Sequence, residues 1–311
     1  MELNQLKLFL DLVREGSFTR VAEQNRLTQP AVSLQIQRLE NELGAKLLER
    51  TTRRVLVTEE GNILAGYARD IVGRAVEARQ VLQERRGKMV GAIRVAAIHS
   101  VGLHELPNYL RKFIRMYPEV HLHIEYHASE RVYHHVTSGA ADVGLVAYPE
   151  QRDNLVTIPF LEDEMVVIVN PEHPLAAAGR DSVRLEELAG ADIIAFDNNI
   201  PTRRATDGVL VQHGVKVNVK MECDNVEIMK KMVEVGMGIA LVPQFSVLHE
   251  SDRASLVVLR LQDYCFLRPL GIIHRKGQPL SRAVQAFVTL LTDKEEQPPA
   301  ELLKPSKRAA A

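Results

Sequence analysis

The stretch "LTQPAVSLQIQRLE" (residues 27–40) predicts an α-helix that opens with a capping threonine and a proline. Thr28 suits the N-cap position, and Pro30 is tolerated in the first turn because the amides there have no intrahelical acceptor. Apolar residues then recur at helical spacing and predict a buried stripe made of Val32, Ile36, Leu39 and Leu43. One face of this helix therefore packs on a core, and the other is left for a partner.

The outer face carries short polar groups with no evident structural task. With about 3.6 residues per turn, Gln29, Ser33 and Gln37 flank the buried stripe, whereas Pro30 and Leu34 point outward. Glutamine can pair with adenine, serine can donate or accept a hydrogen bond, and an apolar group can pack on a thymine methyl. The pattern favours contacts with DNA base edges; the alternative is the solvated face of a small helical bundle.

Two flanking segments complete a DNA-binding arrangement. Apolar spacing predicts a helix over residues 3–15 that Gly16 ends, and Ser17 can cap the next, so that residues 27–40 become the second helix of a helix-turn-helix. Downstream, "ERTTRRVLVTEEG" (49–61) places three arginines around an alternating run and predicts a short basic hairpin. Such a wing can reach phosphates or the minor groove. Its arginines are Arg50, Arg53 and Arg54.

Residues 1–65 resemble the winged helix-turn-helix domain of LysR-type transcriptional regulators. The segment that carries the resemblance is "FLDLVREGSFTRVAEQNRLTQPAVSLQIQRLENELGAKLLERTTRRVLVTEEG". By position, it implies that Gln29, Pro30 and Ser33 are recognition-helix contacts and that Arg53 is the wing contact. Leu34 stands where many members carry arginine. The full predicted DNA-binding set is Gln29, Pro30, Ser33, Leu34, Gln37, Arg50, Arg53 and Arg54.

The composition is that of a globular protein with an uneven charge. At 311 residues the chain predicts two or three domains. Residues 1–88 hold 15 basic and 12 acidic side chains, whereas the remainder holds 24 basic and 28 acidic ones. This asymmetry hints that the N-terminal part contacts a polyanion. The two cysteines are expected to be reduced thiols. No apolar run spans a membrane and no signal peptide is evident, so we expect a cytoplasmic protein with no membrane partner.

A long helix is predicted over residues 59–88, with Thr58 as its cap and Glu59 and Glu60 in its first turn. One apolar stripe runs along it through Ile63, Tyr67, Ile71, Ala75, Ala78 and Leu82. A second copy of the chain is the economical partner for this stripe, and packing on the chain's own domains is the alternative. The resemblance implies antiparallel pairing into a homodimer or homotetramer. "GKMVGA" (87–92) is expected to be a hinge.

Strands and helices alternate from residue 91 onward and predict an α/β domain in two lobes. It resembles the effector domain of the same regulators, which is akin to periplasmic solute-binding proteins, and "EHPLA" (172–176) and "VEVGMGIALVP" (233–243) are its family signatures. The predicted domains are a winged helix-turn-helix (1–58), a linker helix (59–88), an effector domain (91–292) and a disordered tail (293–311). Lobe I covers about 91–162 and 268–292, and lobe II about 163–267.

An effector is expected beyond the carboxyl ends of the strands, where helices begin. The predicted contacts are His99, Ser100, Val101, Ser129, Asn198, Ile200, Thr202, Arg203 and Asn225. The resemblance implies that Ser100, Ser129, the 198–203 loop and Asn225 face the cleft between the lobes. Arg203 or Arg204 would suit a small anion, a carboxylate or a phosphate. For each serine the alternative is a plain helix cap.

The eleven histidines all follow residue 98. His121, His123, Glu125 and His127 share one face of a predicted strand. These side chains could form a metal site, but an exposed or interface face of an edge strand is favoured, and neighbours such as His134 and His135 diverge by about 100° on a helix. No metal and no cofactor are predicted.

The sequence favours a regulator over an enzyme. It has no GxSxG motif and no P-loop, and "GMG" (236–238) follows a helix and precedes a strand, the wrong order for dinucleotide binding. We therefore predict a ligand-responsive transcriptional regulator. Its expected partners are double-stranded promoter or operator DNA, a small-molecule effector, further copies of the chain and RNA polymerase.

Overall fold

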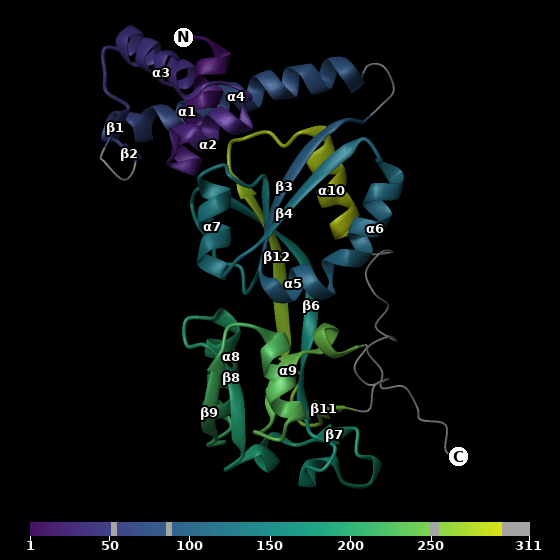
Figure 1. Cartoon of the computed structure of the whole chain (residues 1–311). Helices are drawn as coiled ribbons and strands as arrows, with labels where there is room; N and C mark the ends of the chain where they lie inside the picture. Colours follow the sequence, from purple (N-terminus) through teal and green to yellow (C-terminus); the bar gives the residue numbers. More distant parts are fainter. Residues whose placement is uncertain (51–54, 85–88, 249–254, 294–311) are drawn as a thin grey trace. The chain divides into compact units, whose positions relative to one another are not determined.

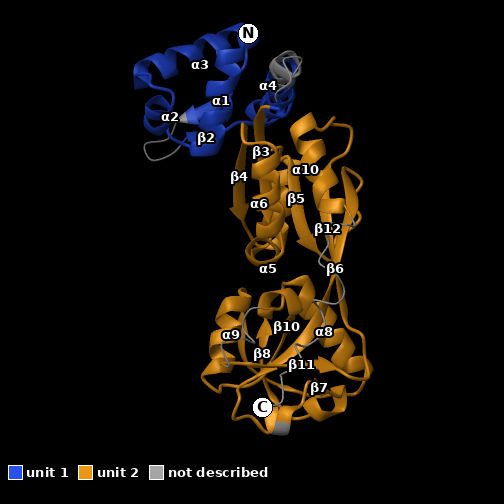
Figure 2. Cartoon of the chain, turned by 90° about the vertical axis from the view of Figure 1, so that its right-hand side faces the viewer, with its two compact units in different colours: residues 1–89 blue, residues 90–311 orange. Residues whose placement is uncertain are grey.

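The computed structural model describes residues 1–50, 55–84, 89–248 and 255–293. The chain forms two compact units, residues 1–89 and residues 90–311 (Figure 2). None of the helices in the described ranges has both the length and the apolar content needed to cross a membrane.

The first unit contains four helices and a hairpin. They are α1 (Leu3–Glu15), α2 (Phe18–Gln24), α3 (Gln29–Leu43), β1 (Leu48–Arg50), β2 (Val55–Val57) and α4 (Glu59–Glu84) (Figure 1). Gly16 ends α1 with a left-handed φ of 62°, and the Ser17 hydroxyl accepts from the Arg20 amide at the start of α2, as predicted. The core of this unit is apolar, and its most buried members include Phe9, Val21, Val32, Leu39 and Ala68.

The C-terminal end of α3 differs from the prediction. Leu43 is 42% exposed, whereas the carboxylate of Glu40 is buried. The Glu40 Oε1 atom accepts hydrogen bonds from the amides of Leu47 (2.9 Å) and Leu48 (3.3 Å), at the start of the hairpin. Burial acts to raise the pKa of Glu40, but the hydrogen bonds from Lys46 and these amides outweigh it and lower the pKa. Apolar spacing could not show this because the partners follow the helix.

The second unit holds the α/β elements. Its first part contains β3 (Gly91–Ala97), α5 (His99–His104), α6 (Leu106–Met116), β4 (Val120–Tyr126), α7 (Ser129–Thr137), β5 (Val143–Ala147) and β6 (Leu155–Val169). Next come η1 (Pro174–Gly179), β7 (Ser182–Val183), η2 (Leu185–Leu188), β8 (Asp192–Phe196), α8 (Pro201–Gln212), β9 (Asn218–Cys223), α9 (Val226–Glu234) and β10 (Ala240–Pro243). The last are η3 (Gln244–Val247), β11 (Val257–Leu261), β12 (Leu267–Arg275) and α10 (Arg282–Thr292).

The main sheet has the strand order β4-β3-β5-β12-β6-β11-β7, and β10 also pairs with β6. The apolar strand β3 lies parallel to β4 and β5, as expected for a strand buried on both faces. The strands β6 and β12 are instead antiparallel, and they pair from Leu267 with Glu164 to Arg275 with Leu155. Figure 1 shows that these two long strands connect the two lobes.

Helices cover both lobes. In lobe I, α6 and α10 pack through Phe113 and Phe287, whose ring centroids are 5.1 Å apart, and α7 lies across the sheet from them (Figure 1). In lobe II, β8 and β9 form a parallel pair that reaches the rest of the lobe through the bridge between Ile193 and Ile239. The predicted lobe boundary near residues 162–163 falls inside β6, where Glu162 pairs with Pro269 of β12. The predicted tail beyond residue 293 lies outside the described residues.

Candidate functional site

The N-terminal turns of α3 form the first candidate surface. The Thr28 hydroxyl accepts from the Ala31 amide at 3.4 Å, which confirms the predicted cap, and Pro30 occupies the first turn. Gln29, Pro30 and Gln37 are exposed, Leu34 is 49% exposed, and Ser33 is half-buried. The buried Val32, Ile36 and Leu39 fix the opposite face of the helix. The five predicted base-contact residues thus stand on or beside an open face.

The hairpin after α3 is the predicted wing. Its strands β1 and β2 are antiparallel, with Leu48 opposite Val57 and Arg50 opposite Val55. Arg53 and Arg54 lie outside the described residues, and so does the side chain of Arg50. The pairing gives the hairpin its register, and the contacts of its three arginines stay a prediction.

The helix α4 begins as predicted and leaves apolar residues uncovered. The Thr58 hydroxyl accepts from the Gly61 amide at 2.9 Å and caps the helix. Ile63, Tyr67 and Ile71 are 59%, 68% and 40% exposed. Ala78 is also exposed, whereas the side chain of Leu82 and residues 85–88 lie outside the described part. An apolar row at four-residue spacing therefore faces outward on the described part of this helix.

The second candidate site lies where the two lobes of the second unit meet. Ser100 is in the first turn of α5, directly after β3, and its hydroxyl accepts a hydrogen bond from the Arg268 Nη2 atom at 2.7 Å. The residues that precede α5 and α7 are Ile98 and Ala128, and neither helix has a side-chain cap. The alternative that Ser100 and Ser129 serve as helix caps is therefore not what the structure has.

Arg268 is buried at this junction together with two carboxyl groups. Arg268 is 2% exposed and Asp163 is fully buried, and their Nη1 and Oδ2 atoms are 3.7 Å apart. The Arg268 Nε and Nη1 atoms have no hydrogen-bond partner among the described residues. Asp163 Oδ1 accepts from the Phe245 amide at 3.3 Å, so the carboxylate also reaches η3 of lobe II. Glu105, which follows α5, is 4% exposed.

These carboxyl groups are hard to ionise. Burial raises the pKa of Asp163 to about 7, although the charge of Arg268 acts in the opposite direction. Burial and the neighbouring Asp163 raise the pKa of Glu105 well above its ordinary value. Near neutral pH the pair therefore carries less negative charge than two ionised carboxylates, and it neutralises Arg268 incompletely.

A second polar contact crosses between the lobes. The His104 Nε2 atom at the end of α5 lies 2.9 Å from the Glu227 Oε1 atom of α9. Lys230, on the next turn of α9 and 4% exposed, lies 2.8 Å from the same oxygen and donates to the Ser246 carbonyl at 2.9 Å. Burial lowers the pKa of His104 more than the charge of Glu227 raises it. Polar side chains thus tie α5 of lobe I to α9 and η3 of lobe II.

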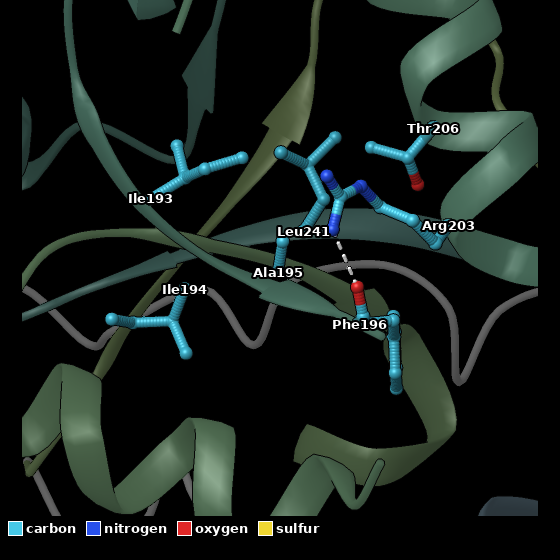
Figure 3. Close-up of a pocket in the computed structure, with 7 residues that line it drawn as sticks. All are labelled: Ile193, Ile194, Ala195, Phe196, Arg203, Thr206 and Leu241. Carbon is cyan, nitrogen blue, oxygen red and sulfur yellow. Dashed lines mark hydrogen bonds between the residues drawn. The ribbon is translucent and has the colours of Figure 1, made fainter. Parts of the chain in front are cut away.

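The lobe II arginine that the sequence singled out already has partners. The Arg203 Nε atom donates to Asp207 at 2.8 Å, and Nη1 donates to Glu222 and to the Phe196 carbonyl, both at 2.7 Å. Figure 3 shows this guanidinium directed at the Phe196 carbonyl, within a pocket also lined by Ile193, Ile194, Ala195, Thr206 and Leu241. The cavity measures only ≈ 10 Å³, about the space of one water molecule. It is too small for an organic effector.

The other predicted contacts are distributed unevenly. Asn225 caps α9 and accepts from the Glu227 amide at 2.8 Å, Thr202 is 2% exposed and Val101 is fully buried. Asn198 is exposed, and Ile200 and Ser129 are half-buried. The ring of His99 lies 6.3 Å from that of Tyr126, centroid to centroid. Of the predicted set, only Ser100 hydrogen-bonds with the buried arginine.

Sequence reasoning missed Arg268, Asp163 and Glu105. Each stands in a stretch with ordinary polar neighbours, and no motif marks it. The one available signal is that Asp163 and Arg268 stand just before the apolar runs 165–169 and 269–273, where a charge that becomes buried needs a partner.

The two units define a class: a helix-turn-helix DNA-binding unit joined to a two-lobed α/β domain of the kind that holds small ligands. Residues 3–62 match the family described as "Bacterial regulatory helix-turn-helix protein, lysR family", and residues 86–296 match "LysR substrate binding domain". The chain belongs to the LysR family of transcriptional regulators, and carries its DNA-binding and effector-binding domains.

Individual relatives agree with this assignment. A protein of Cyanophora paradoxa named "Probable RuBisCO transcriptional regulator" is 31% identical over 92% of this chain and 89% of its own length. A full-length OxyR variant from Pseudomonas aeruginosa has the same fold, with a TM-score of 0.76, 23% identity and 94% of each chain covered. The regulatory domain of CcmR from Synechocystis PCC6803, solved in complex with 2-PG, has a TM-score of 0.59 and 27% identity, and the match covers 65% of this chain and 96% of that domain.

Proposed function

We propose that this regulator responds to a small anionic effector held between the two lobes of its second unit, with Arg268 and Ser100 as its central contacts. The observation that carries the proposal is a buried guanidinium with two nitrogen atoms, Nε and Nη1, that lack hydrogen-bond partners among the described residues. Leaving such donors unsatisfied is costly, and a carboxylate or phosphate is the group that a guanidinium binds best.

The surroundings of Arg268 support an anion in preference to a cation. Asp163 and Glu105 have raised pKa values, so their negative charge is weak near neutral pH. The Ser100 hydroxyl, which accepts from Arg268, still has a proton to donate to a ligand oxygen. Arg203, the arginine that the sequence favoured for this role, is held by Asp207 and Glu222, so the anion contact is assigned to Arg268 instead.

The position of the site supports a switching role. Arg268 belongs to β12, Asp163 to β6, and these two strands connect the lobes. A ligand that changes the contacts of Arg268 therefore acts on the two strands that join the lobes. A ligand shifts such an equilibrium only by its difference in affinity for the two arrangements. The CcmR regulatory domain, 27% identical, binds 2-PG, which supports a small ligand of this kind for the present chain.

We propose that Gln29, Pro30, Ser33, Leu34 and Gln37 meet base edges, and that Arg50, Arg53 and Arg54 contact the backbone or minor groove. Pairing of two chains through the apolar face of α4 would present two recognition helices to two half-sites. We further propose that such dimers assemble into a tetramer, that effector binding changes the separation of the DNA-binding units and the DNA bend, and that RNA polymerase reads the result.

The proposal is tested by footprinting the purified protein on the DNA that flanks its own coding region, with a panel of small carboxylates and phosphates. We expect a long footprint with half-sites about one turn apart that one compound shortens. Arg268→Gln should abolish the response to that compound, whereas Arg115→Gln, which alters an exposed arginine of α6, should leave it intact. A footprint that responds only to uncharged compounds, or a response unchanged in Arg268→Gln, would reject the anion site.

A further inference from the structure

In lobe I, three histidines surround the carboxylate of Glu125. These residues are distant from Arg268 in the sequence. The Glu125 Oε1 atom lies 2.9 Å from the His123 Nε2 atom. The Glu125 Oε2 atom lies 3.0 Å from the His127 Nε2 atom and 3.2 Å from the His135 Nδ1 atom. The donor atoms of Glu125, His127 and His135 all lie within 4.8 Å of one another. The strand face shared by His123, Glu125 and His127 was visible in the sequence, whereas His135 joins the cluster only through the fold.

Two elements build the cluster. His123 and Glu125 are two residues apart on β4, the edge strand of the sheet, so they share one face of it. His127 is the first residue after this strand. His135 comes from α7, the helix packed on the neighbouring strands, which places it over the same face. His127 and His135 have side chains only 15% and 19% exposed, whereas Glu125 and His123 are 42% and 67% exposed. The group is thus partly enclosed and open on one side.

Two members of the group, Glu125 and His135, have pKa shifts that favour their metal-ligating forms. Hydrogen bonds from His123 and His127 lower the pKa of Glu125 to about 2, so it is ionised at neutral pH. Burial and the neighbouring His127 lower the pKa of His135 and favour its neutral ring. The rings of His127 and His135 are 4.3 Å apart, centroid to centroid. Neutral imidazole and ionised carboxylate are the metal-ligating forms.

We propose that Glu125, His127 and His135 bind a divalent transition-metal ion of the Zn²⁺ class, with His123 as a further ligand. Tetrahedral Zn²⁺ with bonds of about 2.0–2.1 Å has ligand atoms roughly 3.3 Å apart, close to the 3.0 and 3.2 Å between the Glu125 oxygen and the two imidazoles. The ion would therefore require small movements of side chains. Imidazole and carboxylate together suit zinc, copper and nickel, and not the all-oxygen sites of magnesium.

Two basic residues of α7, Arg131 and His134, neighbour this site. Both act on His135 electrostatically, and the His134 ring lies 6.2 Å from that of His135. The Arg131 guanidinium repels a bound dication and so limits the affinity of the site. His134 itself is exposed and belongs to no group of converging donors among the described residues.

The test is calorimetric titration of the untagged full-length protein with ZnCl₂, together with the visible absorption spectrum of the Co²⁺-loaded protein. We expect one ion per chain at this site and the absorption bands of Co²⁺ bound by nitrogen and oxygen. His127→Gln and His135→Gln should each weaken binding by about tenfold or more. His134→Gln is the matched control, because it removes the neighbouring imidazole on the same helix and should leave the affinity unchanged.

Circular dichroism and thermal unfolding establish that each variant folds. Should His135→Gln fail to fold, the exposed His123→Gln and the wild-type Co²⁺ spectrum decide the question. The proposal is overturned if the wild type shows no saturable Zn²⁺ binding, if His135→Gln binds like the wild type, or if His134→Gln loses affinity equally. None of these outcomes depends on DNA or effector binding, so they leave the proposed function separately testable.

Discussion

Arg268 donates a hydrogen bond to the Ser100 hydroxyl at 2.7 Å, and the two residues are 168 positions apart in the chain. Arg268 lies on a strand that both lobes share, and Ser100 lies in the first turn of a lobe I helix. This single contact joins the strand that connects the lobes to a residue that the sequence predicted as an effector contact.

Ser100→Ala should weaken the effector response while DNA affinity stays intact. The substitution removes one acceptor of Arg268 and one donor for a ligand, a loss of about 0.5–1.5 kcal/mol for a neutral hydrogen bond and more for a charged partner. Effector titration of the footprint and of DNA binding by anisotropy measures both quantities. Ser138→Ala, at the end of α7, is the control. An unchanged response in Ser100→Ala would remove Ser100 from the effector site.

Gln29→Ala should cost about 1–3 kcal/mol in binding to the specific site, and far less on random DNA, because a base-edge contact discriminates between sequences. Competition binding at fixed salt measures the difference. Gln212→Ala, an exposed glutamine of α8 outside the DNA-binding unit, should change neither affinity. Equal losses on both kinds of DNA would show that Gln29 contacts the backbone.

Asp163 should make the second unit less stable as the pH rises from about 4 to 7. Burial raises its pKa in the folded protein from 3.8 to about 7, so between these values the folded state binds a proton that the unfolded state has released. Stability from this group is then complete below pH 4 and falls with rising pH, by at most about 1.4 kcal/mol per pH unit.

The measurement is urea unfolding of the wild type and of Asp163→Asn across this pH range. Other carboxylates titrate as well, so the informative quantity is the difference between the two proteins. We expect the stability of the wild type relative to Asp163→Asn to decline with rising pH. A constant difference would mean that Arg268 keeps Asp163 ionised throughout.

Charge placed on the exposed face of α4 should prevent pairing of two chains. Tyr67→Glu puts a carboxylate in the centre of the row formed by Ile63, Tyr67 and Ile71, which a dimer would have to bury. Sedimentation velocity should show the oligomer shift to monomer. Asn62→Glu, on a neighbouring exposed position of the same helix, should keep the wild-type assembly. An unchanged oligomer in Tyr67→Glu would place the interface elsewhere.

Local patterns in the sequence were sufficient to predict several helices, turns and strands. The Thr28 cap, the Gly16 and Ser17 turn, the β1–β2 hairpin and the parallel strand β3 all follow from residues within a few positions of one another, where helical and strand periodicity act. The two-lobed α/β class followed from the alternation of such elements, and resemblance extended it to a family.

Contacts between distant segments were decided only by the tertiary structure. Glu40 replaces Leu43 at the end of the buried α3 face because the amides of Leu47 and Leu48 lie within its reach. His135 joins Glu125 and His127, although its neighbour His134 does not, because α7 packs on the strands beside β4 and brings only His135 within reach of them. Arg203 is held by Asp207 and Glu222, so Arg268 is the proposed anion contact in its place. The periodicity of apolar residues predicts which face of a helix or strand is buried. Strand register and helix packing determine which charged side chains meet there, and register and packing depend on the whole chain.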